Sequence, residues 1–273
     1  MDLPQFALHA ALEEHHWWFA GRRAILRVLL EELLPPDGTH LLIDVGCGTG
    51  GITAALSPAY RCIGIDPIPE AIAQAQRRFP TSTYRVGYAP KDVPEMREAD
   101  GVLLMDVLEH LPDDFRVVSE ILAAMKPGAL LFLMAPADLS LWGQHDRGFN
   151  HERRYDLPRL RRLWQGLPVE ELLASSCNTR LYPLAKAARA LSRMMGRSWG
   201  GADTDLSLPP RPLNALLTRI FAREAKRLLG VLRGKARPYR RGISVFAVLR
   251  RGTGAIEPRN FPPDLPRDPT PWR

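Results

Sequence analysis

Short, nearly continuous apolar runs alternate with helical patterns through the first half of the chain. The runs predict strands at 41–45, 60–65, 84–88, 101–105 and 129–135, with helices from about residue 51, at 69–78 and at 113–125. Strands this apolar are typical of a parallel sheet that is buried on both faces. We therefore predict an α/β fold with a doubly wound, mostly parallel, seven-stranded Rossmann-like sheet. Its crossovers should be right-handed, and its ligand crevice should lie beyond the carboxyl ends of the strands.

The segments on either side of this core have helical patterns. Residues 1–38 are predicted to form an N-terminal helical cap of one or two helices at 8–34, and residues 39–179 the core, including a helix at 157–164 and a strand at 169–177. Residues 180–251 are predicted to form a helical insertion, with helices at 184–195 and 213–232 and a final strand at 243–249. Residues 252–273 are proline-rich and lack an apolar period, which predicts a disordered tail.

The net charge of +7 is distributed unevenly along the chain. Residues 180–251 hold 17 Lys and Arg against 3 Asp and Glu, whereas residues 1–179 hold 17 against 24. The basic block indicates an anionic partner, which is a phosphorylated substrate, a nucleic acid or an anionic membrane surface, unless it is only a solvated face. Of these partners a nucleic acid is the less favoured one, because no recognised RNA-binding module accompanies the charge, although a basic patch alone can still attract nucleic acid.

Cysteine usage and hydropathy indicate the compartment. The three cysteines, Cys47, Cys62 and Cys177, are too widely spaced for a disulfide framework or a zinc site, so no metal site is predicted. No apolar run reaches the roughly 20 residues of a spanning helix, and the N-terminus does not have the pattern of a signal peptide. We expect a cytoplasmic protein, with peripheral contact at the inner membrane face as an open alternative.

The segment from Leu42 to Gly51, LIDVGCGTGG, is a strand that runs into a glycine-rich turn at the start of a helix. Glycines there allow unusual backbone angles and let a ligand approach the main-chain N–H groups. The spacing fits both dinucleotide-binding proteins and methyltransferases. Asp66 ends the next strand, where its carboxylate can accept hydrogen bonds from ribose hydroxyls in either class.

Three motifs together favour one class. They are DVGCGTG at 44–50, MDVLEHL at 105–111 and KPG at 126–128. With them, residues 39–178 resemble class I S-adenosylmethionine-dependent methyltransferases. The His-Asp at 145–146, the HERRY at 151–155 and the EHHWWFAGRR at 14–23 resemble a bacterial subgroup, of the methyltransferase type 11/12 kind, that is often linked to cell-surface saccharide pathways.

This resemblance implies S-adenosyl-L-methionine as cofactor. It implies that the methionine part is held by Asp44 and the backbone of Gly46, Cys47, Gly48 and Gly50, the ribose by Asp66, and the exposed side by the segment from Asp106. Tyr88 stands where many relatives have an acidic residue that contacts the adenine, so Asp92 is considered as a replacement. Trp17, Trp18 and Phe19 belong either to a cofactor cap or to the core.

Polar and aromatic residues at 142–155 follow the fifth strand, where chemistry is commonly placed in this fold. Histidine titrates near neutrality, so His145 and His151 are candidate general bases, and Asp146 is placed to orient or replace either. Arg153 and Arg154 either bind an anionic group of the substrate or pair with nearby acidic residues.

Three functions agree with these features. The first is methylation, most simply O-methylation, of a small-molecule, saccharide or lipid-linked acceptor. The second is methylation of a nucleic acid bound by the basic block. The third is a non-catalytic cofactor-binding subunit of a larger enzyme.

Overall fold

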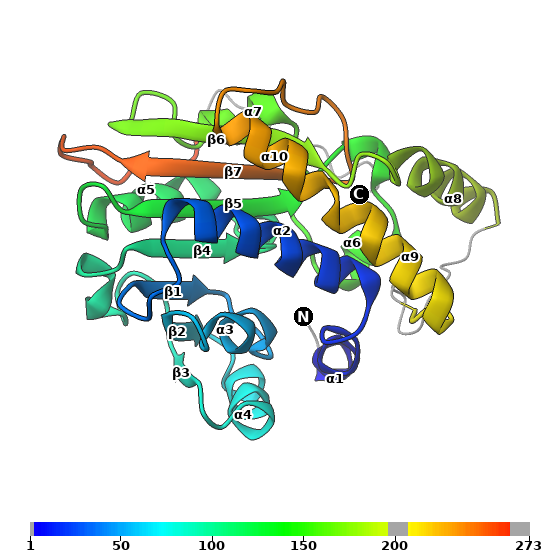
Figure 1. Ribbon diagram of the computed structural model, residues 1–273, viewed down its shortest axis with the longest axis horizontal. Helices are drawn as coiled ribbons and strands as arrows, with labels where there is room; N and C mark the ends of the chain where they lie inside the picture. The colour runs from blue at the N-terminus through cyan, green and yellow to red at the C-terminus, as the bar shows by residue number, and fades with distance from the viewer. Residues whose placement is uncertain (1–2, 196–206, 263–273) are drawn as a thin grey trace.

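A computed structural model describes residues 3–195 and 207–262, and these residues contain a seven-stranded sheet in the order β3-β2-β1-β4-β5-β7-β6. The strands are β1 (Leu41–Val45), β2 (Arg61–Asp66), β3 (Thr83–Val86), β4 (Gly101–Met105), β5 (Leu130–Pro136), β6 (Val169–Cys177) and β7 (Ser244–Arg251). β7 runs antiparallel to both of its neighbours, β5 and β6, as its arrow in Figure 1 shows, and the other pairs of neighbouring strands are parallel. The predicted Rossmann-like fold class is confirmed.

Helices cover both faces of the sheet. They are α1 (Leu3–Leu12), α2 (Trp17–Leu33), α3 (Gly51–Leu56), α4 (Pro69–Arg78), α5 (Asp114–Ala124), α6 (Gln144–Gly148), α7 (Leu157–Arg162), α8 (Tyr182–Met195), α9 (Arg211–Ala222) and α10 (Glu224–Leu232). Single turns of 3₁₀-helix, η1 (Pro94–Arg97), η2 (Leu108–His110) and η3 (Leu139–Leu141), lie in the connections. In Figure 1, α2, α9 and α10 cross one face of the sheet, and α5 lies behind the other.

Successive residues of the central strands serve opposite faces. In β4, Val102 and Leu104 pack with the α5 side, whereas Leu103 and Met105 pack with the α2 side, and all four are buried. This arrangement explains why the strand reads as a continuous apolar run instead of an alternating one.

The N-terminal and C-terminal helices pack directly on each other. A Cβ added to Gly21 of α2 would lie 2.5 Å from Cδ1 of Phe221, whose ring is fully buried, so α9 approaches the backbone of α2. The predicted helix at 213–232 is two helices that meet at Arg223. Glu224 begins the second, and its carboxylate accepts backbone N–H groups of Thr179 and Arg180 at 2.8 and 3.0 Å.

The predicted disordered tail is wrong for residues 252–262. The backbone N–H of Arg259 donates to Ser119 Oγ at 2.9 Å, and its guanidinium donates to three carbonyls at the end of α7 and just after it. The ring of Phe261 lies 5.5 Å from that of Phe115. These contacts come from two side chains, those of Arg259 and Phe261. Two side chains leave no apolar periodicity in the sequence of the tail, so the pattern did not predict the packing. Residues 263–273 lie outside the described residues, as does 196–206 of the predicted loop.

None of the helices in the described ranges is long and apolar enough to cross a membrane.

His16 caps the N-terminus of α2. Its Nδ1 accepts a hydrogen bond from the backbone N–H of Trp18 at 3.3 Å, which requires an unprotonated nitrogen. Burial lowers the pKa of His16 to about 4.

Acidification is therefore expected to weaken the fold through His16. An unfolded chain takes up this proton near pH 6.5, whereas the folded chain resists until about pH 4, so the free energy of unfolding falls as the pH drops through that window. In urea unfolding at about pH 7 and about pH 5, His16→Asn should lose less stability than the wild type, because asparagine also caps but does not titrate there. His15→Asn, at the exposed neighbour, should show the wild-type loss, and equal losses in both variants would contradict this role.

Candidate active site

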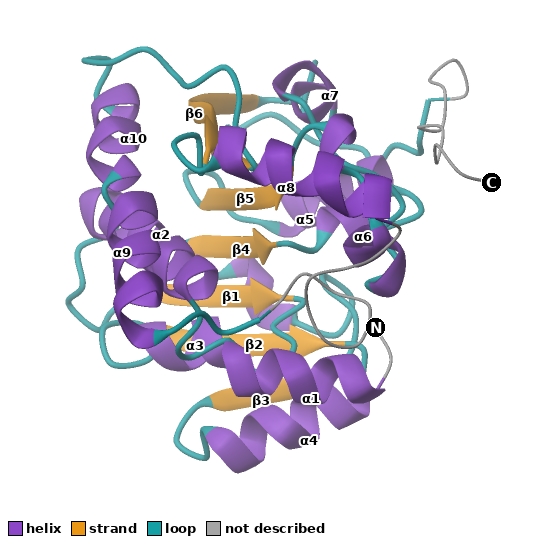
Figure 2. Cartoon of the chain, turned by 90° about the vertical axis from the view of Figure 1, so that its right-hand side faces the viewer, coloured by secondary structure: helices purple, strands orange, loops and turns teal. Residues whose placement is uncertain are grey.

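A pocket of about 790 Å³ lies beyond the carboxyl ends of the parallel strands. Figure 2 shows α1, α6 and α8 gathered on the side to which the strand arrows point. The lining comes from the turns after β1, β2 and β4, from the start of α2, and from α6 and α8. The volume lies in the usual range for small-molecule and cofactor sites.

The glycine-rich turn after β1 forms one wall of this pocket. Gly46, Gly48 and Gly50 have φ values of 70°, 53° and 89°, which L-residues rarely adopt. A Cβ added to Gly48 would meet nothing within 4 Å, so the backbone there faces open space. Gly50 is different: its Cβ would lie 2.6 Å from the hydroxyl of Tyr84, and it does not line the pocket. Gly50 therefore serves packing between α3 and β3 and is not placed to contact a cofactor.

Two predicted acidic residues stand beside the turn and line the pocket. Asp44 accepts a hydrogen bond from Thr53 Oγ1 at 2.7 Å, and burial raises the pKa of Asp44 to about 6. Asp66 accepts the backbone N–H groups of Gly48 and Ile68 at 2.9 and 3.0 Å, and burial raises its pKa as well. Asp66 thus fixes the glycine turn against the end of β2, as well as facing the pocket.

Cys47 and Tyr88 also line the pocket. Burial raises the pKa of the Cys47 thiol well above its usual value, so this group stays neutral and its contribution is its backbone and shape. The backbone N–H of Tyr88 donates to the Asp92 carboxylate at 2.8 Å. Asp92 holds this turn and is not among the lining residues, so the suggested adenine contact of Asp92 is not supported.

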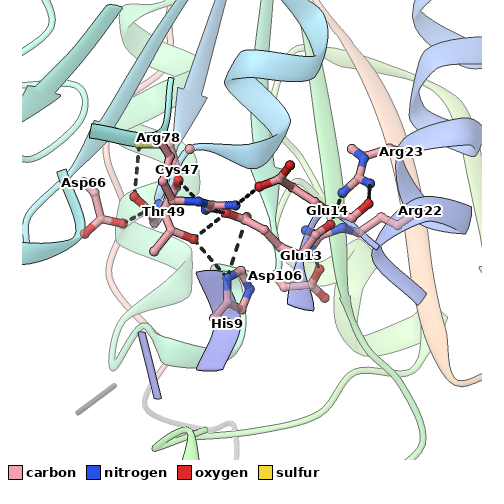
Figure 3. Close-up of polar contacts among 12 residues, drawn as sticks. His9, Glu13, Glu14, Arg22, Arg23, Cys47, Thr49, Asp66, Arg78 and Asp106 are labelled. Carbon is pink, nitrogen blue, oxygen red and sulfur yellow. Dashed lines mark hydrogen bonds and ion pairs between the residues drawn. The ribbon is translucent and has the colours of Figure 1, made fainter. Parts of the chain in front are cut away.

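A polar network that the sequence did not predict holds the N-terminal helix on the glycine turn. Figure 3 shows His9, Glu13, Thr49 and Arg78 pointing toward one another. The Glu13 carboxylate accepts from Thr49 Oγ1 at 2.6 Å and from the guanidinium of Arg78, and His9 Nδ1 lies 3.2 Å from the same Thr49 oxygen. The one sequence feature that could have indicated this network is the acidic pair at 13–14, which lies between two amphipathic segments.

A second ion pair joins the cap to the end of β4. Arg22 of α2 donates to the carboxylate of Asp106, which has a φ of 63°, and both residues line the pocket. The Arg22 guanidinium also stands 4.7 Å from the centre of the Trp18 ring. Trp17 and Trp18 are lining residues, and Phe19 is 1% exposed, so the aromatic triplet serves as both cap and core.

The segment after β5 places histidines on the opposite wall. His145 and His151 line the pocket, with ring centres 6.0 Å apart, and His110 stands 4.9 Å from His151. Burial lowers the pKa of His145 well below its usual value, and nearby His151 lowers it further. Burial also lowers the pKa of His110, to about 3. Both rings are therefore neutral near pH 7.

Asp146 is fully buried and does not line the pocket. Its carboxylate accepts from Arg154 at 2.8 and 3.0 Å and contacts His151 Nδ1 at 2.9 Å. Burial alone would raise the pKa of Asp146, but Arg154 and His151 hold it well below its usual value. Asp146 is thus a fixed anion that positions His151, and its burial away from the lining residues favours this orienting role over that of the base.

The two neighbouring arginines are used within the fold. Arg154 is committed to Asp146, and Arg153 donates to the backbone carbonyls of Leu111 and Pro112. Arg153 is not among the residues that line the pocket, whereas Arg154 lines it with a guanidinium that is already paired with Asp146. The sequence also allowed these arginines to pair with the acidic residues at 152 and 156. In the structure Arg154 pairs with Asp146 instead, and Arg153 binds the two carbonyls.

Two lining residues without a predicted role have unpaired polar atoms. In the described part of the chain, neither side-chain amide atom of Asn178, at the end of β6, has a hydrogen-bond partner, and the same holds for Oε2 of Glu109. Buried polar atoms usually have partners, so both side chains are candidates to bind a ligand. Glu109 lies in the MDVLEHL motif, which gave the available signal, whereas nothing marked Asn178.

Residues 43–133 match a family model described as a methyltransferase domain. The chain is 27% identical over 168 residues to a probable S-adenosylmethionine-dependent methyltransferase of Mycolicibacterium smegmatis, covering 59% of this chain and 63% of the relative. It is 27% identical over 144 residues to a ubiquinone biosynthesis O-methyltransferase of Coxiella burnetii, covering 48% and 61%. The chain thus spans less than two thirds of these relatives.

Among solved structures, a putative sarcosine dimethylglycine methyltransferase from Galdieria sulphuraria superposes with a TM-score of 0.53 at 15% identity, covering 85% of both chains. This likeness shows a shared fold. The family match places a methyltransferase domain at residues 43–133, within the predicted core.

Proposed function

We propose that this protein is an S-adenosyl-L-methionine-dependent methyltransferase that acts on a hydroxyl of a small-molecule, saccharide or lipid-linked acceptor. The observation that carries the proposal is that two groups of functional residues line the same pocket. One wall is the glycine turn with Asp66, and the other carries His145 and His151. Bound S-adenosyl-L-methionine would supply an activated methyl group on a positively charged sulfur.

The residues of the first wall fit this cofactor. Gly48 presents backbone without a side chain toward the open pocket, which leaves room for close approach. Each oxygen of Asp66 accepts one backbone N–H, and a carboxylate oxygen can accept further bonds from ribose hydroxyls. Asp44, Asp66 and Asp106 all line the pocket, so their carboxylates favour a cationic ligand.

The second wall is suited to remove the acceptor's proton. His151 engages Asp146 through Nδ1, which leaves Nε2 for the pocket, and the anion would stabilise the ring after it takes up a proton. Burial lowers the pKa of His145 well below its usual value, which makes it a weaker base. We therefore assign proton removal to His151 and acceptor binding to His145. Holding the acceptor in line within this pocket would supply much of the remaining rate.

The surface near the pocket favours a lipid-linked acceptor. Exposed apolar side chains lie on α8 and on α9, at the end of the molecule beyond the strand ends (Figure 1): they are Leu184, Leu191, Met194, Leu213 and Leu216. Ala185 and Ala188 of the same α8 line the pocket. Basic residues of the 180–251 block accompany this apolar surface, a combination typical of contact with anionic membranes.

Replacing Gly48 by valine should abolish cofactor binding, because the side chain would enter the space that the backbone leaves open and would strain a positive φ. We expect calorimetry with S-adenosyl-L-methionine to show a loss of at least about 100-fold, or about 2.7 kcal/mol. Gly38→Val is the matched control, since Gly38 has a φ of 78° and open surroundings in an exposed turn. Unchanged affinity in Gly48→Val would refute the cofactor assignment.

Replacing His151 by glutamine should lower turnover by about 10²- to 10⁴-fold while cofactor affinity stays near that of the wild type. His145→Gln should raise KM more than it lowers kcat. Turnover is measured as transfer of a tritiated methyl group to the lipid, glycan or RNA fraction that accepts it. Wild-type turnover in His151→Gln contradicts the assignment, and label in RNA alone contradicts the acceptor class.

The membrane contact is tested by sedimentation with phospholipid vesicles. We expect a larger bound fraction with vesicles that contain anionic phospholipid than with purely zwitterionic ones, and less binding for Leu184→Asp. Val86→Asp adds the same charge at an exposed apolar position on the edge strand β3, and it should bind as the wild type does. Equal binding of Leu184→Asp and the wild type would show that α8 makes no contact.

A further inference from the structure

We infer that Glu109, His110 and His151 form a binding site for a divalent transition-metal cation within the pocket. One carboxylate oxygen and one nitrogen from each imidazole lie within 4.8 Å of one another. Glu109 and His110 come from the turn after β4, and His151 from the segment after α6. The cysteine spacing gave no sign of this site, because its ligands are histidine and glutamate.

The side chain of His151 is already oriented for coordination of a cation. His151 Nδ1 lies 2.9 Å from Asp146 Oδ1, and Arg154 holds that carboxylate with two hydrogen bonds. Metal-binding histidines commonly bond a carboxylate through one ring nitrogen and the metal through the other. The buried Asp146–Arg154 pair therefore supplies the outer support that such a ligand needs.

Glu109 supplies the second, independent observation. The residue is 2% exposed, it lines the pocket, and its Oε2 has no hydrogen-bond partner in the described ranges. An unpaired carboxylate oxygen in such a place is costly, and a cation coordinated there would satisfy it.

The local charges leave room for a cation. Arg22 is paired with Asp106, and Arg154 with Asp146, so these two guanidinium groups are each matched by their own carboxylate. Burial and nearby Asp106 raise the pKa of the Glu109 carboxyl well above its usual value, so a cation bound there would displace its proton.

The donor set selects the kind of cation. Two imidazoles and one carboxylate suit Zn²⁺, Fe²⁺ or Co²⁺, whereas Mg²⁺ and Ca²⁺ prefer oxygen ligands. Three protein ligands leave further positions for an acceptor oxygen. This role rests on the proposed function and replaces one assignment in it: with a cation bound, His151 would be a ligand instead of the base, and the cation would promote proton loss from the acceptor.

The binding itself is tested without turnover. The chain, free of any histidine tag and stripped with a chelator, is titrated with Zn²⁺ by calorimetry and with Co²⁺ by visible absorption. We expect one equivalent per chain and the strong visible bands of cobalt with fewer than six ligands. Glu109→Gln and His110→Gln should each weaken binding at least tenfold, and Asp146→Asn about 10- to 100-fold. His15→Gln, at an exposed histidine, is the matched control.

S-adenosyl-L-methionine affinity is measured on each variant to show that it is folded. No stoichiometric binding to the wild type, or wild-type metal affinity in both folded ligand variants, overturns the site. The cobalt spectrum of the wild type decides the matter even if a variant fails to fold. Metal binding without cofactor binding would instead count against the proposed function, so the two failures are distinguishable.

Discussion

The burial of the central sheet on both faces is the constraint on which the rest of the structure depends. Because β4 and β5 lie between two helical layers, their side chains are apolar throughout and carry no chemistry. Polar groups emerge where the strands end, and parallel strands end at the same edge. Asp44, Asp66 and Asp106 each belong to such an end or to the turn that follows. The position of the pocket therefore follows from strand direction.

The parts of the fold and site that were predictable are those encoded over short stretches of sequence. The strands up to β5 and the glycine turn depend on neighbouring residues, and so does the place of Asp66. The contacts of the cap were not predictable, because they join residues that are far apart in the sequence. Glu13 accepts hydrogen bonds from Thr49, 36 residues away, and from Arg78, 65 residues away. No local sequence pattern specifies the carboxylate with which a distant arginine will form an ion pair.

The histidine-rich segment shows the same division. Its motif indicated a functional region, and His145 and His151 do line the pocket. The motif could not show which charged residues reach the pocket: Asp146 is buried and pairs with Arg154, eight residues later, and of the two only Arg154 is a lining residue. A fully buried charge needs a partner of opposite charge, and this requirement, which no local pattern encodes, ties Asp146 to Arg154 and makes it a support for His151.

The place of β7 has a consequence for the order in which the chain can assemble. β5 and β6 are separated in the sheet by a strand that comes later in sequence than either. A ribosome releases residues 130–177 well before residues 244–251. Until β7 is synthesised, the backbone edges of β5 and β6 that pair with it have no partner strand. Open edges of this kind invite pairing with other chains. A chain interrupted before Ser244 would keep its pocket-forming turns but lack the strand that joins β6 to the sheet, which makes aggregation the expected fate of incomplete synthesis.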